Sequence, residues 1–134
     1  MRKNQVSRTG NPVDSLTGII VESILEKKGE EVVTLDLRRV NEAITDAFII
    51  CHADATVQVK AITDNIRKKV KENTGRSPWH SEGYENLEWV VLDYAEVVVH
   101  IFISEKRTFY NLEELWSDAA KWSKRGELNR IKNV

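Results

Sequence analysis

The sequence predicts a single α/β domain in which helices pack against a mixed β-sheet. Three observations favour this fold class. Apolar residues recur at helical spacing in separate segments, short runs rich in β-branched residues alternate with those segments, and two such runs are separated by about four residues, as in a hairpin. The 134 residues suffice for one domain and are too few for two independent cores. We expect the domain to span 11–120, between basic tails at 1–10 and 121–134.

The first helix is expected to begin at Asn11, a favoured N-cap residue, with Pro12 in its first turn, and to end at Gly29. Its apolar stripe consists of Leu16, Ile20 and Ile24. Two strands should follow. Residues 33–37 alternate between apolar and polar, whereas 47–51 form a continuous apolar run, which is typical of a more deeply buried strand.

A second long helix is predicted after the buried strand, capped by Asp54 or Thr56 and ended by Gly75. Its apolar stripe consists of Val59, Ile62, Ile66 and Val70. Because a strand–helix–strand passage usually joins parallel strands, this helix indicates that the sheet is mixed.

The second half of the chain predicts a short strand at 79–84, a hairpin of 87–92 with 97–103, and a last helix. That helix should open at Asn111, which forms a capping-box variant with Glu114. The residues on its apolar side are Leu112, Leu115, Trp116 and Ala119.

Candidate catalytic groups are sparse. Cys51, His52 and Asp54 stand at the end of a strand, yet neighbours along a strand point to opposite faces, so we interpret Cys51 as a core residue. His80 and His100 are too far apart in sequence to form a metal motif, and we expect a structural or surface role for His100.

Phosphoryl-transfer chemistry is equally unsupported by the sequence. A two-metal site needs paired carboxylates, and no D-x-D or D-x-E spacing occurs. No glycine-rich phosphate loop is present. We therefore expect no enzymatic activity, no metal and no cofactor. The alternative interpretation is a nucleotide-binding enzyme related to nucleotidyltransferases, with Asp36, Asp46 or Asp93 holding a metal.

Aromatic residues gather between 79 and 116, in a region that is also rich in acids. Helical spacing explains Trp116 as a core residue, and we interpret Phe109 in the same way. Trp89 lies on a strand face, and with Tyr94 and Phe102 nearby it could supply the rigid anchors of a protein interface.

Charge is unevenly distributed. Residues 1–10 carry +3 and 121–134 carry +4, so that 11–120 hold −8 of a total of −1. An acidic body suits a basic protein partner better than nucleic acid. The single cysteine and the lack of a signal-like or membrane-spanning apolar run predict a cytoplasmic protein that binds no membrane.

Six ordered blocks are together far more specific than any short motif. They are ITDAFIIC (44–51), QV with AI (58–62), WHSEG (79–83), WVVLDY (89–94), VVHIF (98–102), and the segment from Arg107 through Tyr110 to Leu115 and Trp116. These blocks, which span roughly 13–120, resemble the ribosomal silencing factor RsfS, or Iojap, family.

That resemblance implies a nucleotidyltransferase-like mixed sheet without the catalytic carboxylates. It also implies binding to the large ribosomal subunit through ribosomal protein L-fourteen. A bound factor would block joining of the small subunit and repress translation, with a possible link to large-subunit maturation. Family members often form homodimers when free, and contact of the basic tails with ribosomal RNA is a further hypothesis.

Carried over by position, the resemblance implies a partner-binding surface in this chain. Its residues are Trp89, Asp93, Tyr94 and Phe102, with Glu82, His100 and Tyr110 as neighbours. Two segments depart from the family pattern. Ala95 stands where glycine is usual, which could alter the hairpin turn because alanine tolerates positive φ poorly. Residues 52–56 replace a usual Gly/Ser-containing turn, where Thr or Asp still offers a helix cap.

Overall fold

The computed structural model describes residues 14–40, 43–115, 120–123 and 127–130. The helices and strands, in chain order, are α1 (Asp14–Glu26), β1 (Glu30–Asp36), β2 (Ala47–Ala53), α2 (Thr56–Thr74), β3 (His80–Glu82), β4 (Trp89–Asp93), β5 (Val97–Ile103), α3 (Ser104–Tyr110), α4 (Leu112–Leu115), β6 (Ala120–Ser123) and β7 (Glu127–Arg130).

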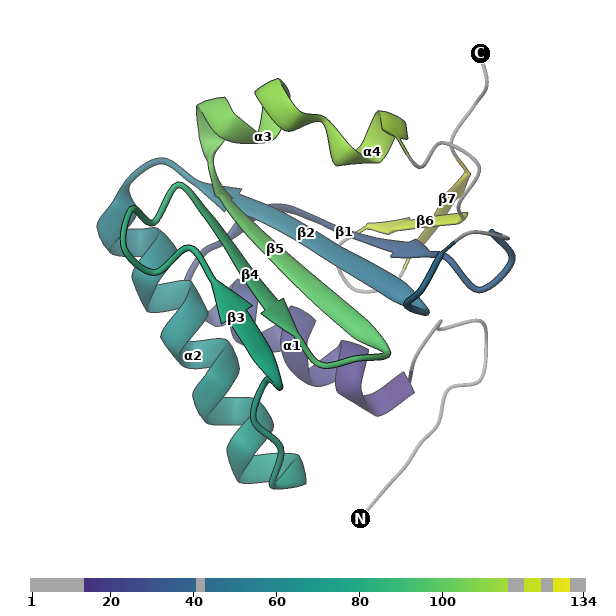
Figure 1. Cartoon of the computed structure of the whole chain (residues 1–134), viewed down its shortest axis with the longest axis horizontal. Coiled ribbons are helices and arrows are strands. Elements are labelled where there is room, and N and C mark those ends of the chain that lie inside the picture. Colours follow the sequence, from purple (N-terminus) through teal and green to yellow (C-terminus); the bar gives the residue numbers. More distant parts are fainter. Residues whose placement is uncertain (1–13, 41–42, 116–119, 124–126, 131–134) are drawn as a thin grey trace.

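The described strands form one mixed sheet in the order β3-β4-β5-β2-β1-β6-β7. β2 and β5 are parallel, and the other neighbouring pairs are antiparallel. α1 and α2 cover one face of the sheet, and α3 with α4 lies over the opposite face (Figure 1). The α/β fold class and the 87–103 hairpin are confirmed.

The larger core lies between the sheet and the helices α1 and α2. Both helical stripes predicted from the sequence are buried there, and every member of the α2 stripe is fully enclosed. Burying each such aliphatic side chain stabilises the fold by about 1.5–3 kcal/mol. Gly75 ends α2 as predicted, with a φ of 78° that glycine adopts without steric cost.

A smaller core lies on the opposite face, toward α3 and α4. Its buried members are Val33, Leu35, Leu37, Ile50 and Phe102. Half-buried side chains packed against it include Phe48, Trp89 and Leu112. This face is therefore only partly enclosed by the described residues.

The predicted cap of α2 is wrong, and the predicted start of the first helix is not tested. Asn11 and Pro12 lie outside the described residues. The N-cap of α2 is Ala55, with no side-chain cap, so the expectation of a cap at Asp54 or Thr56 is wrong. The cause is that β2 continues to Ala53, and Asp54 Oδ1 instead accepts a hydrogen bond of 3.1 Å from Ser104 Oγ.

The region after β5 contains two short helices. α3 begins directly from β5 at Ser104, without a side-chain cap, and was not predicted. Asn111 ends α3 in a left-handed conformation, and α4 begins at the next residue. Asn111 Nδ2 donates to Glu114 Oε1 at 2.6 Å, so the predicted pair does meet. Trp116 and Ala119 lie outside the described residues.

The largest difference between prediction and structure concerns the C-terminal segment, which was predicted to be a tail. Residues 120–123 and 127–130 form β6 and β7, and β6 pairs with β1. Without this pairing, the outer edge of β1 would present unsatisfied backbone groups. The sheet thus extends beyond residue 120, where the sequence predicted only a basic tail. Of the described helices, none combines the length and apolar character needed to cross a membrane.

Candidate functional site

The partly open sheet face carries a cluster of aromatic side chains. Strand register brings positions 89, 100 and 102 to the same face, because Trp89 pairs with Phe102 and Val91 with His100. We call this cluster the aromatic face. It consists of Phe48, Trp89, His100, Phe102 and Tyr110.

Trp89 is the centre of the aromatic face. Its ring centroid lies 5.1 Å from that of Phe102 and 4.4 Å from that of Tyr110. Its indole Nε1 donates a 3.0 Å hydrogen bond to His100 Nδ1. The half-buried indole is thus held in one orientation while part of its surface remains accessible. A rigid, partly exposed tryptophan is the typical anchor of a protein interface.

His100 is a buried histidine that orients the cluster. It is 6% exposed, and burial lowers its pKa to about 4, so the imidazole is neutral at physiological pH. Because Nδ1 accepts from Trp89, the proton resides on Nε2. That atom has no hydrogen-bond partner among the described residues. The structural role expected for His100 fits this environment.

Tyr94 does not belong to the aromatic face, contrary to the expectation that it would act beside Trp89. Side chains alternate along β4, so Tyr94 shares the side of Val90 and Leu92 and packs in the core under α2. It is 1% exposed, and burial raises its pKa to about 12. Phe102 is also 1% exposed, but it lies directly beneath Trp89 and supports that ring.

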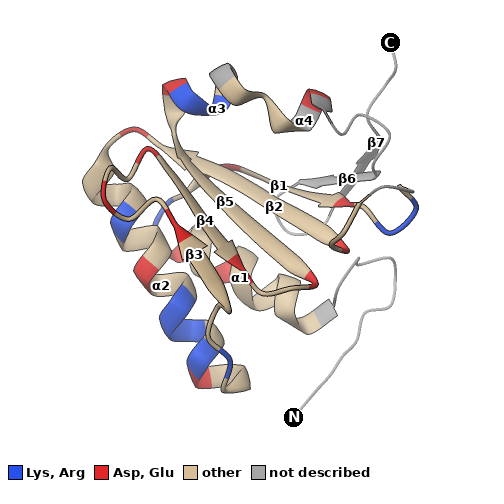
Figure 2. Ribbon diagram, viewed as in Figure 1, with Lys and Arg blue, Asp and Glu red and all other residues tan. Residues whose placement is uncertain are grey.

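Acidic residues border the aromatic face along β3 and β4, as Figure 2 shows. Glu82 lies on β3 opposite Val91 and is exposed, with its carboxylate 2.8 Å from His80 Nε2. Glu88, next to Trp89, is exposed as well. Asp93 is half-buried and its Oδ1 accepts from the backbone N–H of Ala95. We call Glu82, Glu88 and Asp93 the acidic rim.

The residues considered for catalysis are dispersed. Cys51 is fully buried in the core beneath α2, where burial raises its thiol pKa to about 12. His52 points to the other face and accepts a 3.0 Å hydrogen bond from Arg107. Asp36 is paired with Arg38. Within the described residues, no three His, Cys, Asp or Glu side chains come together as a metal-binding group.

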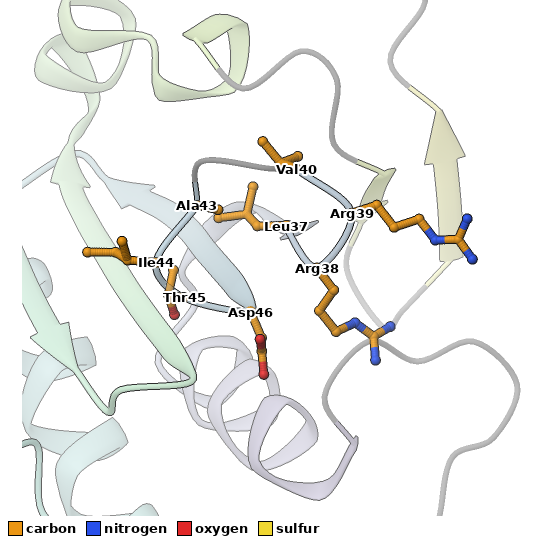
Figure 3. Close-up of a pocket in the computed structure, with 8 residues that line it drawn as sticks. All are labelled: Leu37, Arg38, Arg39, Val40, Ala43, Ile44, Thr45 and Asp46. Carbon is orange, nitrogen blue, oxygen red and sulfur yellow. The ribbon is translucent and has the colours of Figure 1, made fainter.

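A cavity of ≈ 340 Å³ is formed by the loop that joins β1 to β2. Figure 3 shows Ile44 pointing to the opposite side from Arg38 and Arg39. Ile44 is 98% exposed, which is unusual for a large apolar side chain. We identify no chemistry in this cavity. Ile44 adds exposed apolar surface just before β2, the strand that carries Phe48.

Sequence reasoning missed Phe48 and Ile44 as surface features. Phe48 belongs to the run 47–51 that we interpreted as a buried strand, and Ile44 precedes that run. The available signal for Phe48 was strand alternation, which separates it from its buried neighbours Ala47 and Ile49. No comparable signal marked Ile44.

The chain is similar to known proteins over most of its length. The family described as "Ribosomal silencing factor during starvation" matches residues 11–134. The ribosomal silencing factor RsfS of Halalkalibacterium halodurans is 41% identical over 104 residues, covering 78% of this chain and 87% of that protein. RsfS of Bacillus subtilis is 36% identical over 105 residues, with the same coverages.

Solved structures agree with the sequence relatives. A crystal structure from Chromobacterium violaceum matches with a TM-score of 0.71 and 32% identity, over 75% of this chain and 82% of that one. A structure from Bacillus halodurans matches with a TM-score of 0.66 and 40% identity, over 75% and 92% respectively. The chain therefore belongs to the RsfS family of ribosomal silencing factors.

Proposed function

We propose that this protein binds the large ribosomal subunit in the cytoplasm through ribosomal protein L-fourteen. The bound protein prevents the small subunit from joining, which represses translation when nutrients are scarce. The mechanism is steric occlusion and involves no catalysis. A contribution to large-subunit maturation fits the same binding event, and a murine relative carries the name "Mitochondrial assembly of ribosomal large subunit protein 1".

One observation carries the proposal. The aromatic face is a sheet face that α1 and α2 do not cover, with a fixed tryptophan at its centre and acids at its border. Partly exposed aromatic clusters of this kind supply binding energy, and surrounding charges guide the partner to them.

The partner-binding residues have distinct roles in this proposal. Trp89 and Tyr110 contact the partner directly, and Tyr110 is 42% exposed. Glu82 and Asp93 face basic residues of the partner. His100 and Phe102 position Trp89 from below. Tyr94 acts only through the core that supports β4.

The test is binding of the purified protein to isolated large subunits, followed by a subunit-joining assay. Trp89→Ala is expected to weaken binding at least tenfold, an effect typical of interface anchors. Val57→Ala is the control, because Val57 is 79% exposed and lies at the start of α2, outside the aromatic face. Both variants are first checked for folding by circular dichroism.

A second variant tests the same surface without changing any buried or half-buried side chain. Glu82→Lys with Glu88→Lys changes only exposed side chains and should also weaken binding. If Trp89→Ala and the acidic-rim variant bind as the wild type does, the interface lies elsewhere. If the wild-type protein fails to bind large subunits, the occlusion mechanism itself is wrong.

We also propose that the free protein forms a homodimer that covers the aromatic face. A second copy would remove exposed apolar surface from water until the ribosomal partner competes for it. Sedimentation of the free protein should then show a dimer that Trp89→Ala weakens. A dimer unaffected by this substitution would use another surface.

Contact of the basic tails with ribosomal RNA stays a prediction. Deleting 121–134 is a poor test, because it removes most of β6 and all of β7 from the sheet edge. Replacing Lys124, Arg125 and Lys132 with glutamine removes charge without deleting a strand. Unchanged subunit affinity and unchanged salt dependence would contradict the prediction.

A further inference from the structure

The second half of α2 and the loop after it carry a concentrated positive charge on the helix-covered side of the molecule. Residues 67–76 contain five cations and a single acid. Figure 2 shows these basic positions along the lower part of α2, with the acidic position among them. Residues 11–120 as a whole carry a net negative charge, so the local positive charge of 67–76 needs a separate explanation.

Three of these cations are available to an external partner. Lys69 lies 4.0 Å from Glu26, and Arg76 forms a 2.8 Å pair with Glu96. Arg67, Lys68 and Lys71 are exposed and make no ion pair with any carboxylate of the described residues. They lie on adjacent turns of one helix, so their charges act together.

Arg67 is held in place by a neutral side chain. Its guanidinium donates a 2.9 Å hydrogen bond to the hydroxyl of Tyr84 and lies 5.6 Å from the centre of that ring. This contact orders the long side chain and leaves its charge unneutralised. An ordered cation loses less conformational entropy when it binds an anion.

Trp79 places an exposed aromatic ring in the loop that follows these cations and leads to β3. It is 77% exposed, and its backbone N–H donates to the carbonyl of Asp93 at 2.9 Å. Lys71 Nζ lies 3.4 Å from the carbonyl of Gly75, so this cation reaches the loop that leads from α2 to Trp79. Arg76 also bonds the Tyr94 carbonyl, at 2.7 Å, so the loop is fixed where α2 ends.

We infer that Arg67, Lys68, Lys71 and Trp79 form a binding surface for single-stranded RNA. The cations would contact successive phosphates, and the indole would stack on an unpaired base. An exposed tryptophan among phosphate-binding cations is the combination that single-strand binding uses, and a duplex would offer no free base face to Trp79. The α2 cations of this surface lie across the sheet from the aromatic face, so the surface does not include the residues proposed to bind the protein partner.

The experiment measures fluorescence anisotropy of a labelled single-stranded RNA of about twelve nucleotides as the full-length protein is added at several salt concentrations. Lys68→Glu with Lys71→Glu should weaken binding at least tenfold. It should also flatten the slope of log K against log salt by about 1.4, the value for two lost phosphate contacts on a single strand. Trp79→Ala should weaken binding about tenfold with an unchanged salt slope, because it removes stacking and no charge.

Two controls make the result specific. Lys27→Glu with Lys28→Glu causes the same change in net charge at exposed positions near the start of α2, where Gln58 bonds that turn. Trp89→Ala alters the other face. Neither should change the affinity for RNA by more than twofold. Equal losses in the two charge-reversal variants would mean non-specific attraction and would overturn the inference.

Binding of the wild type to anionic vesicles with no binding to RNA would also overturn it. If RNA binding is lost in the α2 variant while large-subunit binding persists, both surfaces exist and act separately. If subunit binding fails but RNA binding behaves as described, only the proposed function is wrong.

Discussion

Trp89 is oriented before any partner arrives. Its indole is hydrogen-bonded to His100 and stacked on Phe102, so the side chain would lose little conformational freedom on binding. Pre-organised anchors give high affinity because less entropy is lost on association. His100 serves this purpose only as a neutral imidazole, since the atom that accepts from the indole must stay unprotonated.

The buried imidazole makes stability depend on pH. Burial lowers the pKa of His100 from 6.5 to about 4, so between these values the unfolded chain binds a proton that the folded chain does not. Folding stability therefore falls as the pH drops from 6.5 to about 4, by about 3 kcal/mol from this group. His100→Gln should remove this contribution. Urea unfolding of both proteins across this range measures the difference, and parallel stability curves would contradict it.

Tyr94 shows that an aromatic residue adjacent in sequence to a strand of the aromatic face can belong to the core. Its hydroxyl is buried and has no hydrogen-bond partner among the described residues. A buried polar group without a partner costs about 1–3 kcal/mol. Tyr94→Phe should therefore leave stability unchanged or raise it by about 1 kcal/mol, and it should not affect binding to large subunits. If the variant has normal stability but binds large subunits more weakly, Tyr94 takes part in binding and this prediction is wrong.

At the scale of elements, the long periodic segments were predictable and the short ones were not. The stripes of α1 and α2 and the alternation of β4 identified those elements because a continuous core imposes one period on many residues. α3 is seven residues long and follows β5 without a side-chain cap, so no local signal marks its start. β6 is defined by its pairing with β1, a tertiary contact that the basic sequence after residue 120 does not encode locally.

The candidate site was predictable in part for the same reason. The resemblance gave the positions of Trp89, Phe102 and Tyr110, and alternation along the strand could have placed Tyr94 on the other face. Exposure was harder to predict. Whether Ile44 or Phe48 reaches the surface depends on which part of the sheet α3 and α4 cover, and that follows from packing between distant segments.

The β4–β5 turn contains a strained residue. Ala95 has a φ of 78°, held by hydrogen bonds from Thr45 Oγ1 to its carbonyl and from its own N–H to Asp93. This left-handed conformation costs a non-glycine residue about 1–2 kcal/mol. Ala95→Gly should therefore raise the free energy of unfolding by about 1 kcal/mol. Ala61→Gly, inside α2, should lower it by a similar amount, because glycine disfavours a helix interior.

Thermal and urea unfolding of the two glycine variants test this contrast. The opposite signs exclude a general effect of glycine on the unfolded chain. A loss of stability in both variants would show that the turn holds Ala95 without strain. Because Asp93 of the acidic rim caps this turn, the stabilised variant should also bind large subunits at least as well as the wild type.

As a whole, the molecule separates its charges. The acidic rim and aromatic face lie on one side of the sheet, and the α2 cations lie on the other. A small protein between a basic protein and a polyanionic RNA can use this arrangement to set its orientation, since the wrong side is repelled by each partner. The proposed occlusion requires a fixed orientation, because only a protein bound in one pose would block the surface that the small subunit joins.

This separation predicts different kinetic effects for the two parts of the protein-binding surface. Glu82→Lys with Glu88→Lys should slow association with large subunits and weaken its salt dependence, because exposed charges act mainly on the approach of the partners. Trp89→Ala should leave association nearly unchanged and speed dissociation, because anchor contacts form only after docking. Stopped-flow association at several salt concentrations and displacement by unlabelled protein measure the two rates. If the charge reversals change only the dissociation rate, the acidic rim contacts the partner after docking and does not guide its approach. The proposed division of roles between the acidic rim and Trp89 would then be wrong.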